Sequence, residues 1–546
     1  MYIKKLKIEN FKCFEKYEII FNDKVNVLVG NNDVGKSTIL EAIHLCLTGF
    51  YRGKYLKNNL IQDIFNNNCL KTYIEKIKEN KATQLPKCMI ELYFEECDPV
   101  FLGKENTDGV NECSISYTIE FDSKYTDEYN YYIENGNIFS LPIEYYNVSW
   151  VNSAGIDITG RTTPTKSIII DTSETNLRNS SDTYVSKIVK DNLDNDELLG
   201  ISQLYRETRD NFVEDELLKQ INEKISKNTH ILNTNIQLDV ESLKATDWEK
   251  SIITKINSIP FEYVGKGIQS AIRIELSLNS KSAESAGVLL IEEPENHLSF
   301  SKMSKLLNEI VSFDNSKQIF ITTHSSFVAN KLNIENLILL NKDKYFKFVG
   351  LNPDTFNFFM KKPGYDTLRF LLCEKAILVE GDADELIIQK AYFDKYGRLP
   401  IESEIDVISV GNTFLRFLEI ATIIEKKTLV LTDNDGDIDA LKKKYELYMG
   451  DNKKEYIKIL FDSKTHNSQG QLKSKNGGTF NYDTLEPCLL RANNLETLNN
   501  ILNRNDTDPD DLLKYMVEHK TECAIKIFDS EEKINYPTYI EEAIND

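Results

Sequence analysis

The feature that most constrains this chain is the octapeptide Gly30–Ser37, GNNDVGKS, which matches the pattern GxxxxGK[ST] in full. It follows the apolar run Val25–Val29, which predicts a buried strand, and precedes Thr38–Leu47, whose apolar residues recur at helical spacing. Backbone N–H groups of such a loop and the dipole of the following helix both face a bound phosphate. The motif therefore predicts an α/β fold that binds a nucleoside triphosphate.

Residue types within this segment indicate individual roles. Lys36 is expected to neutralise the outer phosphates, and the Ser37 hydroxyl to ligate the Mg²⁺ of ATP. The candidate ATP-binding residues here are Asn32, Gly35, Lys36, Ser37 and Thr38.

Two apolar runs farther along the chain also end in polar residues. Val288–Glu295 predicts a strand that ends in acids, and such a strand can present Glu292 toward Mg²⁺ and Glu293 toward an attacking water. Ile319–Thr323 predicts another strand, and His324 directly after it is a candidate contact of the γ-phosphate. Taken alone, the first run is equally compatible with a buried strand that has a solvated end, and a lone His at a strand end is more often structural.

The segment Gly265–Ser270, GKGIQS, precedes a predicted helix. Alone it is a weak signal, because Gly-x-Gly is common in turns. In their order and spacing, however, all these segments resemble an ABC-type ATPase head of the SMC and RecF-like branch. The resemblance assigns Gly267 and Gln269 to a signature that caps the ATP of a second head, which implies a homo-oligomer of at least two chains. Two departures leave the rate of ATP turnover open: Glu292 stands where the family has Asp, and GKGIQ differs from LSGGQ.

The segments between these motifs suggest how the chain is divided. Residues 173–245 combine a polar stretch with a helical pattern over 197–227, without sustained heptads, which predicts a mostly helical insert and no long coiled coil. We expect the ATPase head to occupy 1–172 and 246–372, and a second α/β domain to occupy 373–546.

The second domain is predicted from a regular alternation of apolar patterns. Short runs with strand character alternate with amphipathic segments, in the order strand 376–379, helix 384–396, strand 405–410, helix 414–424 and strand 428–431. This βαβαβ order is the unit of a parallel sheet.

Carboxylates follow two of these strands. Glu380 ends the first strand, Asp384 lies one turn into the next helix, and Asp433 and Asp435 follow the third strand. Because ligands bind at the carboxyl ends of parallel strands, we expect the four acids to share one crevice. Mg²⁺ or Mn²⁺ would relieve their mutual repulsion, and two such ions about 4 Å apart can support phosphodiester cleavage. By itself, Asp433–Gly436 would also make an ordinary turn.

The strand-end Glu-Gly and the later Asp-x-Asp resemble the Toprim domain. An ABC-type head followed by Toprim resembles the OLD (overcoming lysogenization defect) family of nucleases, which includes the Gabija nuclease subunit, over nearly the whole chain. The resemblance implies an ATPase and metal-dependent DNA endonuclease whose insert dimerises. Asp483–Glu486 then supplies Glu486 as a metal ligand, and His519–Ala524 supplies Lys520 to stabilise charge on the phosphate. The competing interpretation of Lys520 is a solvated surface lysine.

The charge distribution qualifies how DNA would be held. The net charge of −21 excludes an overall basic surface for nucleic acid. Residues 441–475 nevertheless contain nine Lys against four acids, a local charge of +5, with Lys473 and Lys475 in a glycine-containing stretch. A basic loop that grips the DNA backbone and a solvated lysine face are equally compatible with this pattern.

Composition limits the cellular setting. No apolar run approaches the ~18 residues that a membrane span needs, and the N-terminus lacks the apolar core of a signal peptide. The nine Cys form no CxxC pair, which argues against a zinc ribbon or a disulfide framework and for a reducing compartment. We therefore expect a cytoplasmic protein without a membrane partner.

These features predict an ATP-coupled, Mg²⁺- or Mn²⁺-dependent DNA endonuclease. The resemblance to the OLD family implies a role in anti-phage defence, with a helicase-like or other defence protein as a candidate partner. The alternative is an ATP-switched DNA-binding or scaffold protein of the RecF/SMC type whose Toprim centre is inactive. A RecF-like repair ATPase is a third interpretation, but it would not need the second domain.

Overall fold

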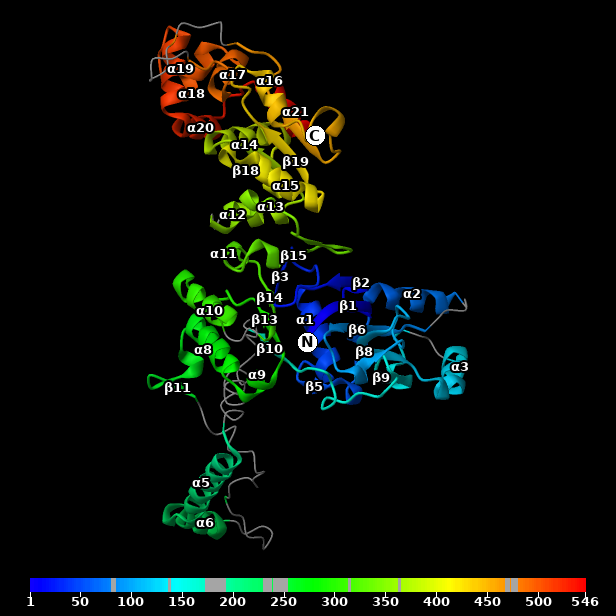
Figure 1. Cartoon of the computed structure of the whole chain (residues 1–546). Helices are drawn as coiled ribbons and strands as arrows, with labels where there is room; N and C mark the ends of the chain where they lie inside the picture. Colours follow the sequence, from blue (N-terminus) through cyan, green and yellow to red (C-terminus); the bar gives the residue numbers. More distant parts are fainter. Residues whose placement is uncertain are drawn as a thin grey trace. The chain divides into compact units, whose positions relative to one another are not determined.

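A computed structural model describes residues 1–79, 85–135, 139–171, 193–228, 238, 254–312, 316–361, 365–466, 472 and 480–546 (Figure 1). The chain divides into two compact units. The first contains residues 1–28 and 32–323, and the second contains residues 29–31 and 324–546. The domain boundaries that we expect from the sequence remain predictions.

An antiparallel sheet forms one layer of the first unit. Its strands are β1 (Tyr2–Phe11), β2 (Phe14–Ile20), β6 (Cys88–Glu95), β7 (Leu102–Gly103), β8 (Glu112–Phe121) and β9 (Tyr146–Asn152). They run in the order β2-β1-β6-β8-β7, with β9 paired to β8. Apolar residues such as Leu6 and Leu92 lie opposite one another in the register and are fully buried. This face therefore covers part of the core.

A parallel sheet forms the second layer. In the first unit its strands are β10 (Ser167–Asp171), β13 (Val288–Glu292), β14 (Gln318–Thr322) and β3 (Val25–Val29), paired in that order. Helix α1 (Lys36–Thr48) contacts both this sheet and strands β6 and β8 of the antiparallel sheet. That position explains why residues on all sides of α1 are buried. The strands and helix predicted around the glycine-rich loop are confirmed.

Helices make up the described part of the insert. The two helices α5 (Asn195–Glu214) and α6 (Glu216–Asn228) confirm the helical pattern over 197–227, and no residue of α5 is buried. The rest of the predicted insert, apart from residues 193, 194, 215 and 238, lies outside the described residues. After it come α8 (Lys266–Leu278), α9 (Lys281–Ser285) and α10 (Phe300–Ser312).

The second unit begins with connecting elements. These are α11 (Ser326–Lys331), the hairpin strands β15 (Leu337–Leu340) and β16 (Tyr345–Lys347), α12 (Pro353–Lys361) and α13 (Tyr365–Leu372).

A four-stranded parallel sheet follows, in the order β18-β17-β19-β20. Its strands are β17 (Lys375–Val379), β18 (Ile405–Ser409), β19 (Lys427–Leu431) and β20 (Ile457–Leu460), connected through α14 (Asp382–Tyr396), α15 (Phe414–Ile424) and α16 (Ile438–Lys444). The predicted βαβαβ order is confirmed. Helices α17 (Leu485–Ala492), α18 (Leu495–Leu502), α19 (Pro509–Glu518), α20 (Lys520–Asp529) and α21 (Thr538–Asn545) complete the unit.

The register of this sheet sets the position of the acids. Leu378 pairs with Val430, and Leu431 pairs with Leu460. Strands β17 and β19 therefore end at the same edge, where Glu380 and Asp433 follow them.

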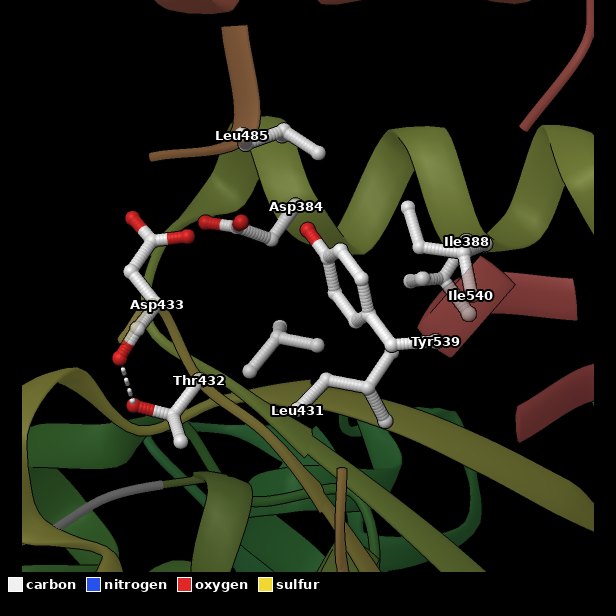
Figure 2. Close-up of a pocket in the computed structure, with 9 residues that line it drawn as sticks. Asp384, Ile388, Leu431, Thr432, Asp433, Leu485, Tyr539 and Ile540 are labelled. Atoms are coloured by element: carbon white, nitrogen blue, oxygen red, sulfur yellow. Dashed lines mark hydrogen bonds between the residues drawn. The ribbon is translucent and has the colours of Figure 1, made fainter. Parts of the chain in front are cut away.

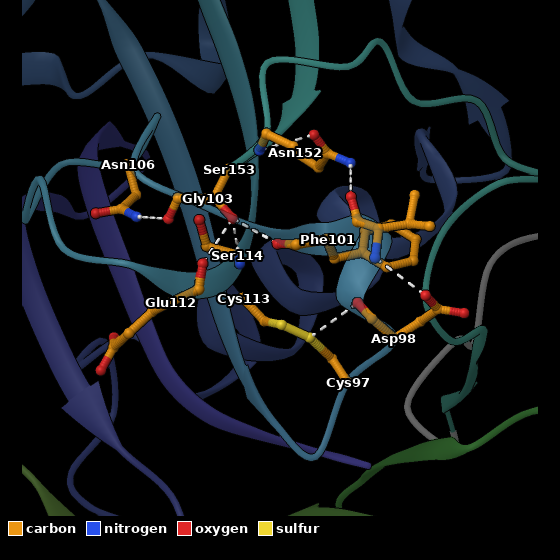
Figure 3. Close-up of a disulfide and its surroundings, with 12 residues drawn as sticks. Cys97, Asp98, Phe101, Gly103, Asn106, Glu112, Cys113, Ser114, Asn152 and Ser153 are labelled. Carbon is orange, nitrogen blue, oxygen red and sulfur yellow. Dashed lines mark hydrogen bonds between the residues drawn. A yellow bond between two sulfur atoms is a disulfide. The ribbon is translucent and has the colours of Figure 1, made fainter.

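A disulfide joins Cys97 and Cys113 (Figure 3), whereas the Cys pattern argues only against a framework of several such bonds. Cys113 lies opposite Phe94 in the pairing of β6 with β8, and the turn after β6 returns Cys97 toward it, with 6.4 Å between the two Cα atoms. Strand register rather than sequence spacing creates this proximity, which is why the Cys pattern does not reveal it.

Among the described residues, no helix is both long enough and apolar enough to cross a membrane.

Candidate functional sites

The glycine-rich loop adopts a shape that only glycine permits at Gly35. Gly35 precedes α1 with φ +95°, in the left-handed region, and Asp33 also has positive φ. A Cβ atom at Gly35 would overlap the ring of Phe14 and lie 2.8 Å from Cys13 Sγ. Any larger side chain would therefore displace the loop from its place over strand β2.

Lys36 is buried at the start of α1, with 7% of its surface exposed. Burial lowers the pKa of Lys36, and the charges of Glu293, Asp33, Glu295 and Glu292 oppose this effect. The ammonium group of Lys36 therefore lies among acids that favour its charged form. The phosphates of a bound nucleotide would add negative charge and favour that form further.

Ser37 and Glu292 meet directly. The Ser37 hydroxyl donates a hydrogen bond to Glu292 Oε1, joining the start of α1 to the end of β13. A hydroxyl and a carboxylate oxygen side by side are the hard ligands that Mg²⁺ prefers. The pair fits the metal of an ATP complex, and Glu292 can take the place of the shorter Asp that the family usually has.

Glu293 is held in an unusual backbone conformation, with φ +43°. Its N–H donates to the backbone oxygen of Thr322 at 3.1 Å, and its Oε2 accepts from Asn296 Nδ2 at 3.0 Å. These contacts hold Glu293 at the carboxyl edge of the parallel sheet. Non-glycine residues with positive φ persist where surrounding contacts enforce them, and they gather at active sites.

The other predicted ATP-site residues are placed as follows. Asn32 is exposed in the loop, and Thr38 is buried in α1. Gln269, on α8, donates through Nε2 to the backbone oxygens of Phe261 and Val264, both at 2.8 Å, so its amide stabilises its own loop. The remaining two candidates are Gly267, where a Cβ would overlap the carbonyl oxygen of His297, and His324, which is exposed two residues beyond the end of β14.

A small pocket lies at the carboxyl edge of the second unit's sheet, and Asp384 and Asp433 meet in it (Figure 2). Figure 2 shows their carboxylates pointing toward one another. Apart from Thr432 and Tyr539, the remaining lining is aliphatic, from Val379, Ile388, Leu431, Leu485 and Ile540.

This environment disfavours negative charge on both acids. Burial, together with the charges of Glu486 and Glu380, raises the pKa of Asp384 to about 6. Burial raises the pKa of Asp433 as well, and Asp384 and Glu380 add to that effect. Two facing carboxylates in a partly apolar pocket are stable together when they share a proton or bind a cation. Their oxygens therefore fit a hard divalent metal.

Glu380 and Asp435 occupy different positions around this pair. Glu380 Oε1 accepts a hydrogen bond from the Thr432 hydroxyl at 2.9 Å, directly beside Asp433. Asp435 is exposed, and its Oδ1 accepts from Asn481 Nδ2 at 2.7 Å. Asp433 thus lines the pocket, whereas Asp435 does not.

Glu486 and Lys520 form an ion pair. Glu486 is buried at the start of α17, and the Lys520 ammonium, at the start of α20, lies 3.1 Å from its Oε1. Burial would lower the pKa of Lys520, but Glu486 and Asp433 outweigh it, so that pKa is raised. Lys520 is therefore a stable cation whose field extends to the acids of the pocket.

Several residues near the acids were not among the site residues predicted from the sequence. Tyr539 comes from the last helix, and Asn481 bridges Asp435 to the backbone N–H of Asp483. The buried Asp483 side chain in turn holds His466, whose N–H and ring Nδ1 lie 2.7 and 3.0 Å from Asp483 Oδ1. Only Asn481 had a usable signal, because it lies two residues before the DTLE segment.

The basic segment is only partly described. Lys442, Lys443 and Lys444 are exposed on α16, and Lys464 is exposed after β20, whereas Lys473 and Lys475 lie outside the described residues.

Within the described ranges, no three His, Cys, Asp or Glu side chains converge tightly enough to form a ready-made metal site. A cation here would have to draw in at least one ligand beyond the Asp384–Asp433 pair.

Two families match the chain. The AAA ATPase domain family matches residues 1–329, and the Toprim domain of overcoming-lysogenization-defect-like proteins matches residues 371–435. The chain belongs to the OLD family of ATPase–Toprim proteins. The fold class predicted from the sequence, an α/β ATPase head followed by a Toprim domain, is confirmed. An OLD-family chain of this kind has the domains of an ATP-dependent enzyme of the nuclease type.

Curated relatives resemble parts of this OLD-family chain. A DNA replication and repair protein RecF from Clostridium acetobutylicum is 53% identical over 49 residues, which cover 9% of this chain and 14% of RecF. An ATP/GTP phosphatase from Helicobacter pylori is 23% identical over 354 residues, 59% of this chain and 85% of the phosphatase. A second RecF, from Alkaliphilus oremlandii, is matched over only 21% of its length. The match to each RecF is thus confined to a small part of that protein.

Solved structures give a low overall similarity. An SMC head bound to the C-terminal winged-helix domain of ScpA has a TM-score of 0.33 and 15% identity, and covers 64% of this chain and 99% of that one. The SMC head domain from Thermotoga maritima has a TM-score of 0.28 and 14% identity over the same shares.

Proposed function

We propose that this chain is an ATP-coupled, divalent-metal-dependent DNA endonuclease, which nicks or cuts both strands and acts in anti-phage defence. The observation that carries the proposal is the facing pair Asp384 and Asp433 at the edge of the Toprim sheet, with raised pKa values and with Glu380, Glu486 and Lys520 around it. Such a concentration of perturbed acids is typical of a catalytic centre.

The residues that would hold Mg²⁺ or Mn²⁺ are Glu380, Asp384, Asp433, Asp435 and Glu486. When bound, the metal activates water and offsets negative charge on the phosphate. The Thr432 hydroxyl orients Glu380, and the aliphatic lining keeps bulk water away from Asp384 and Asp433. Lys520 can release Glu486 to the metal and turn its ammonium toward the phosphate oxygens, where it stabilises the charge of the transition state.

The ATPase head would supply the coupling. Lys36, with Asn32, Gly35 and Thr38 around it, binds the phosphates, and Ser37 with Glu292 holds the Mg²⁺ of ATP. Glu293 and His324 orient the attacking water and the γ-phosphate. Gly267 and Gln269 act on the ATP of a second copy, which requires a homo-oligomer of at least two chains.

Support for assembly also comes from the insert. Leu199, Leu204 and Phe212 on α5 and Leu217 on α6 are each more than half exposed. If two copies of the α5–α6 helix pair packed against each other, these side chains would be buried. The exposed lysines Lys442, Lys443, Lys444 and Lys464 suit a DNA backbone. The proposed cytoplasmic location rests on the composition, and the helicase-like or other defence partner rests on the family resemblance alone.

The test compares cleavage and ATP hydrolysis on one preparation of each variant. Purified protein is incubated with supercoiled plasmid, with and without Mg²⁺, Mn²⁺ and ATP. Asp433→Asn keeps the side-chain size but removes the charge, and it should abolish cleavage while ATP hydrolysis, fold and DNA binding persist; Asp435→Asn and Glu380→Gln should act alike. Loss of several kcal/mol of metal stabilisation corresponds to on the order of a thousand-fold in rate. Cleavage that persists in Asp433→Asn would place the chemistry elsewhere.

One observation favours a second candidate. Because no three potential ligands converge in the described residues, an ATP-switched DNA-binding scaffold with an inactive Toprim centre is the rival. That rival predicts that wild-type protein binds DNA and hydrolyses ATP but leaves plasmid intact at every metal concentration.

A further inference from the structure

Tyr539 belongs to the wall of the acidic pocket, although it lies on the last helix of the chain. It is buried, with 8% of its surface exposed, and it lines the pocket together with Asp384 and Asp433. Figure 2 shows its hydroxyl pointing toward Asp384. The polar end of Tyr539 is thus directed at the two acids.

The surroundings of Tyr539 fix its ring and keep its proton. Ile388, Leu431 and Ile540 line the same pocket as the ring. Burial raises the pKa of Tyr539 far above its usual range, and the charges of Asp433 and Asp384 raise it further. The hydroxyl therefore keeps its proton at neutral pH and can donate a hydrogen bond.

Helix α21 is anchored at its far end as well. The Asp546 carboxylate forms an ion pair with Lys458 on β20 and lies 3.8 Å from the ammonium of Lys375 on β17. The Tyr396 hydroxyl, on α14, donates to the backbone oxygen of Ile544 at 3.0 Å. The helix is thus held against both the sheet and α14, which limits the positions open to the Tyr539 hydroxyl.

Asp384 has one oxygen already committed. Its Oδ2 accepts the N–H of Gly381 at 3.0 Å, within the first turn of α14. Among the described residues, no protein group donates a hydrogen bond to the other oxygen, Oδ1. A donor directed at Asp384 from the opposite wall would complete its orientation.

We propose that Tyr539 is a positioning residue that donates a hydrogen bond to Asp384 and so fixes this carboxylate for binding a hard divalent cation. The inference rests on the proposed nuclease function and extends the centre to the C-terminal helix. Groups that hydrogen-bond a metal ligand restrict its rotation, and their removal typically weakens metal affinity about 10- to 100-fold. Tyr539 thereby makes metal affinity depend on the docking of α21.

The test uses the full chain with Tyr539→Phe, which removes one oxygen and keeps the ring. Tyr536→Phe is the matched control, because Tyr536 lies three residues away and its hydroxyl donates to Asp394 instead, at 2.5 Å. Mn²⁺ affinity is measured by calorimetry without DNA or nucleotide, beside the Mn²⁺ concentration that gives half-maximal plasmid cleavage. Thermal melts without metal show whether each variant is folded.

We expect Tyr539→Phe to weaken Mn²⁺ binding about 10- to 100-fold, and to recover most of its cleavage at saturating Mn²⁺, while Tyr536→Phe binds as wild type does. Wild-type affinity in a folded Tyr539→Phe overturns the inference, as does equal weakening in both variants. If wild type binds Mn²⁺ and does not cleave, the nuclease proposal fails, and the difference in affinity between the two variants still decides the role of Tyr539.

Discussion

The ammonium of Lys520 lies 3.1 Å from a carboxylate oxygen of Glu486. The two residues begin different helices, α20 and α17, and Glu486 is almost fully buried whereas Lys520 is about half exposed. The pair joins a candidate metal ligand to the candidate stabiliser of phosphate charge.

Lys520→Ala should reduce plasmid cleavage on the order of a hundred- to a thousand-fold, because a donor aimed at the developing charge is lost. Lys526→Ala is the control, since Lys526 lies on the same helix but pairs with the exposed Glu522. Cleavage rates at saturating Mn²⁺ decide the matter. If the two alanine variants cleave equally fast, Lys520 is an ordinary surface lysine.

Acidification should stabilise the metal-free protein through Asp384. Its pKa is about 6 in the folded chain against an ordinary value of 3.8, so the native state binds a proton that the unfolded state releases. The unfolding free energy contributed by this group therefore rises as pH falls through 6 toward 3.8, by about 3 kcal/mol at most.

Melting temperatures at pH 7.5 and pH 5.5, recorded in EDTA, test this effect. Asp384→Asn should melt at a higher temperature than wild type at pH 7.5, and should lose this advantage at pH 5.5. A difference between variant and wild type that does not change with pH would contradict it.

The ATP site should separate binding from hydrolysis. Lys36→Ala removes the buried cation that faces the phosphates, and we expect ATP binding to be lost. Glu293→Gln keeps the hydrogen-bonding shape but removes the candidate base, so it should trap bound ATP by slowing hydrolysis. Nucleotide binding and phosphate release are measured on both variants. ATP hydrolysis at the wild-type rate in Glu293→Gln would show that another residue activates the water.

Deletion of residues 173–245 should yield monomers with reduced ATPase activity. The hairpin of α5 and α6 would be removed with its exposed apolar side chains, and the shared ATP site would lose the second head. Light scattering, with and without ATP, measures the mass of deletion variant and wild type. A wild-type chain that remains monomeric with ATP would exclude the shared site.

Much of the fold could be predicted from local order in the sequence. The glycine-rich loop, its strand and its helix are contiguous, so the phosphate-binding geometry follows from a single short segment. Glu380 and Asp433 could also be placed together, because parallel strands joined by helices end at one edge of their sheet. In both cases, the local sequence pattern and the connection of parallel strands through helices are enough to place the residues. Side-chain packing does not need to be known.

Other features depended on contacts between distant segments. The register of β6 with β8 joined Cys97 to Cys113, and the docking of the last helix brought Tyr539 to Asp384. In the turn after β19, where Asp435 has positive φ, Asp433 lines the pocket and Asp435 is exposed outside its lining. Sequence determined which residues stand at the strand ends, whereas burial and side-chain packing, which depend on the whole folded unit, decided which of them meet.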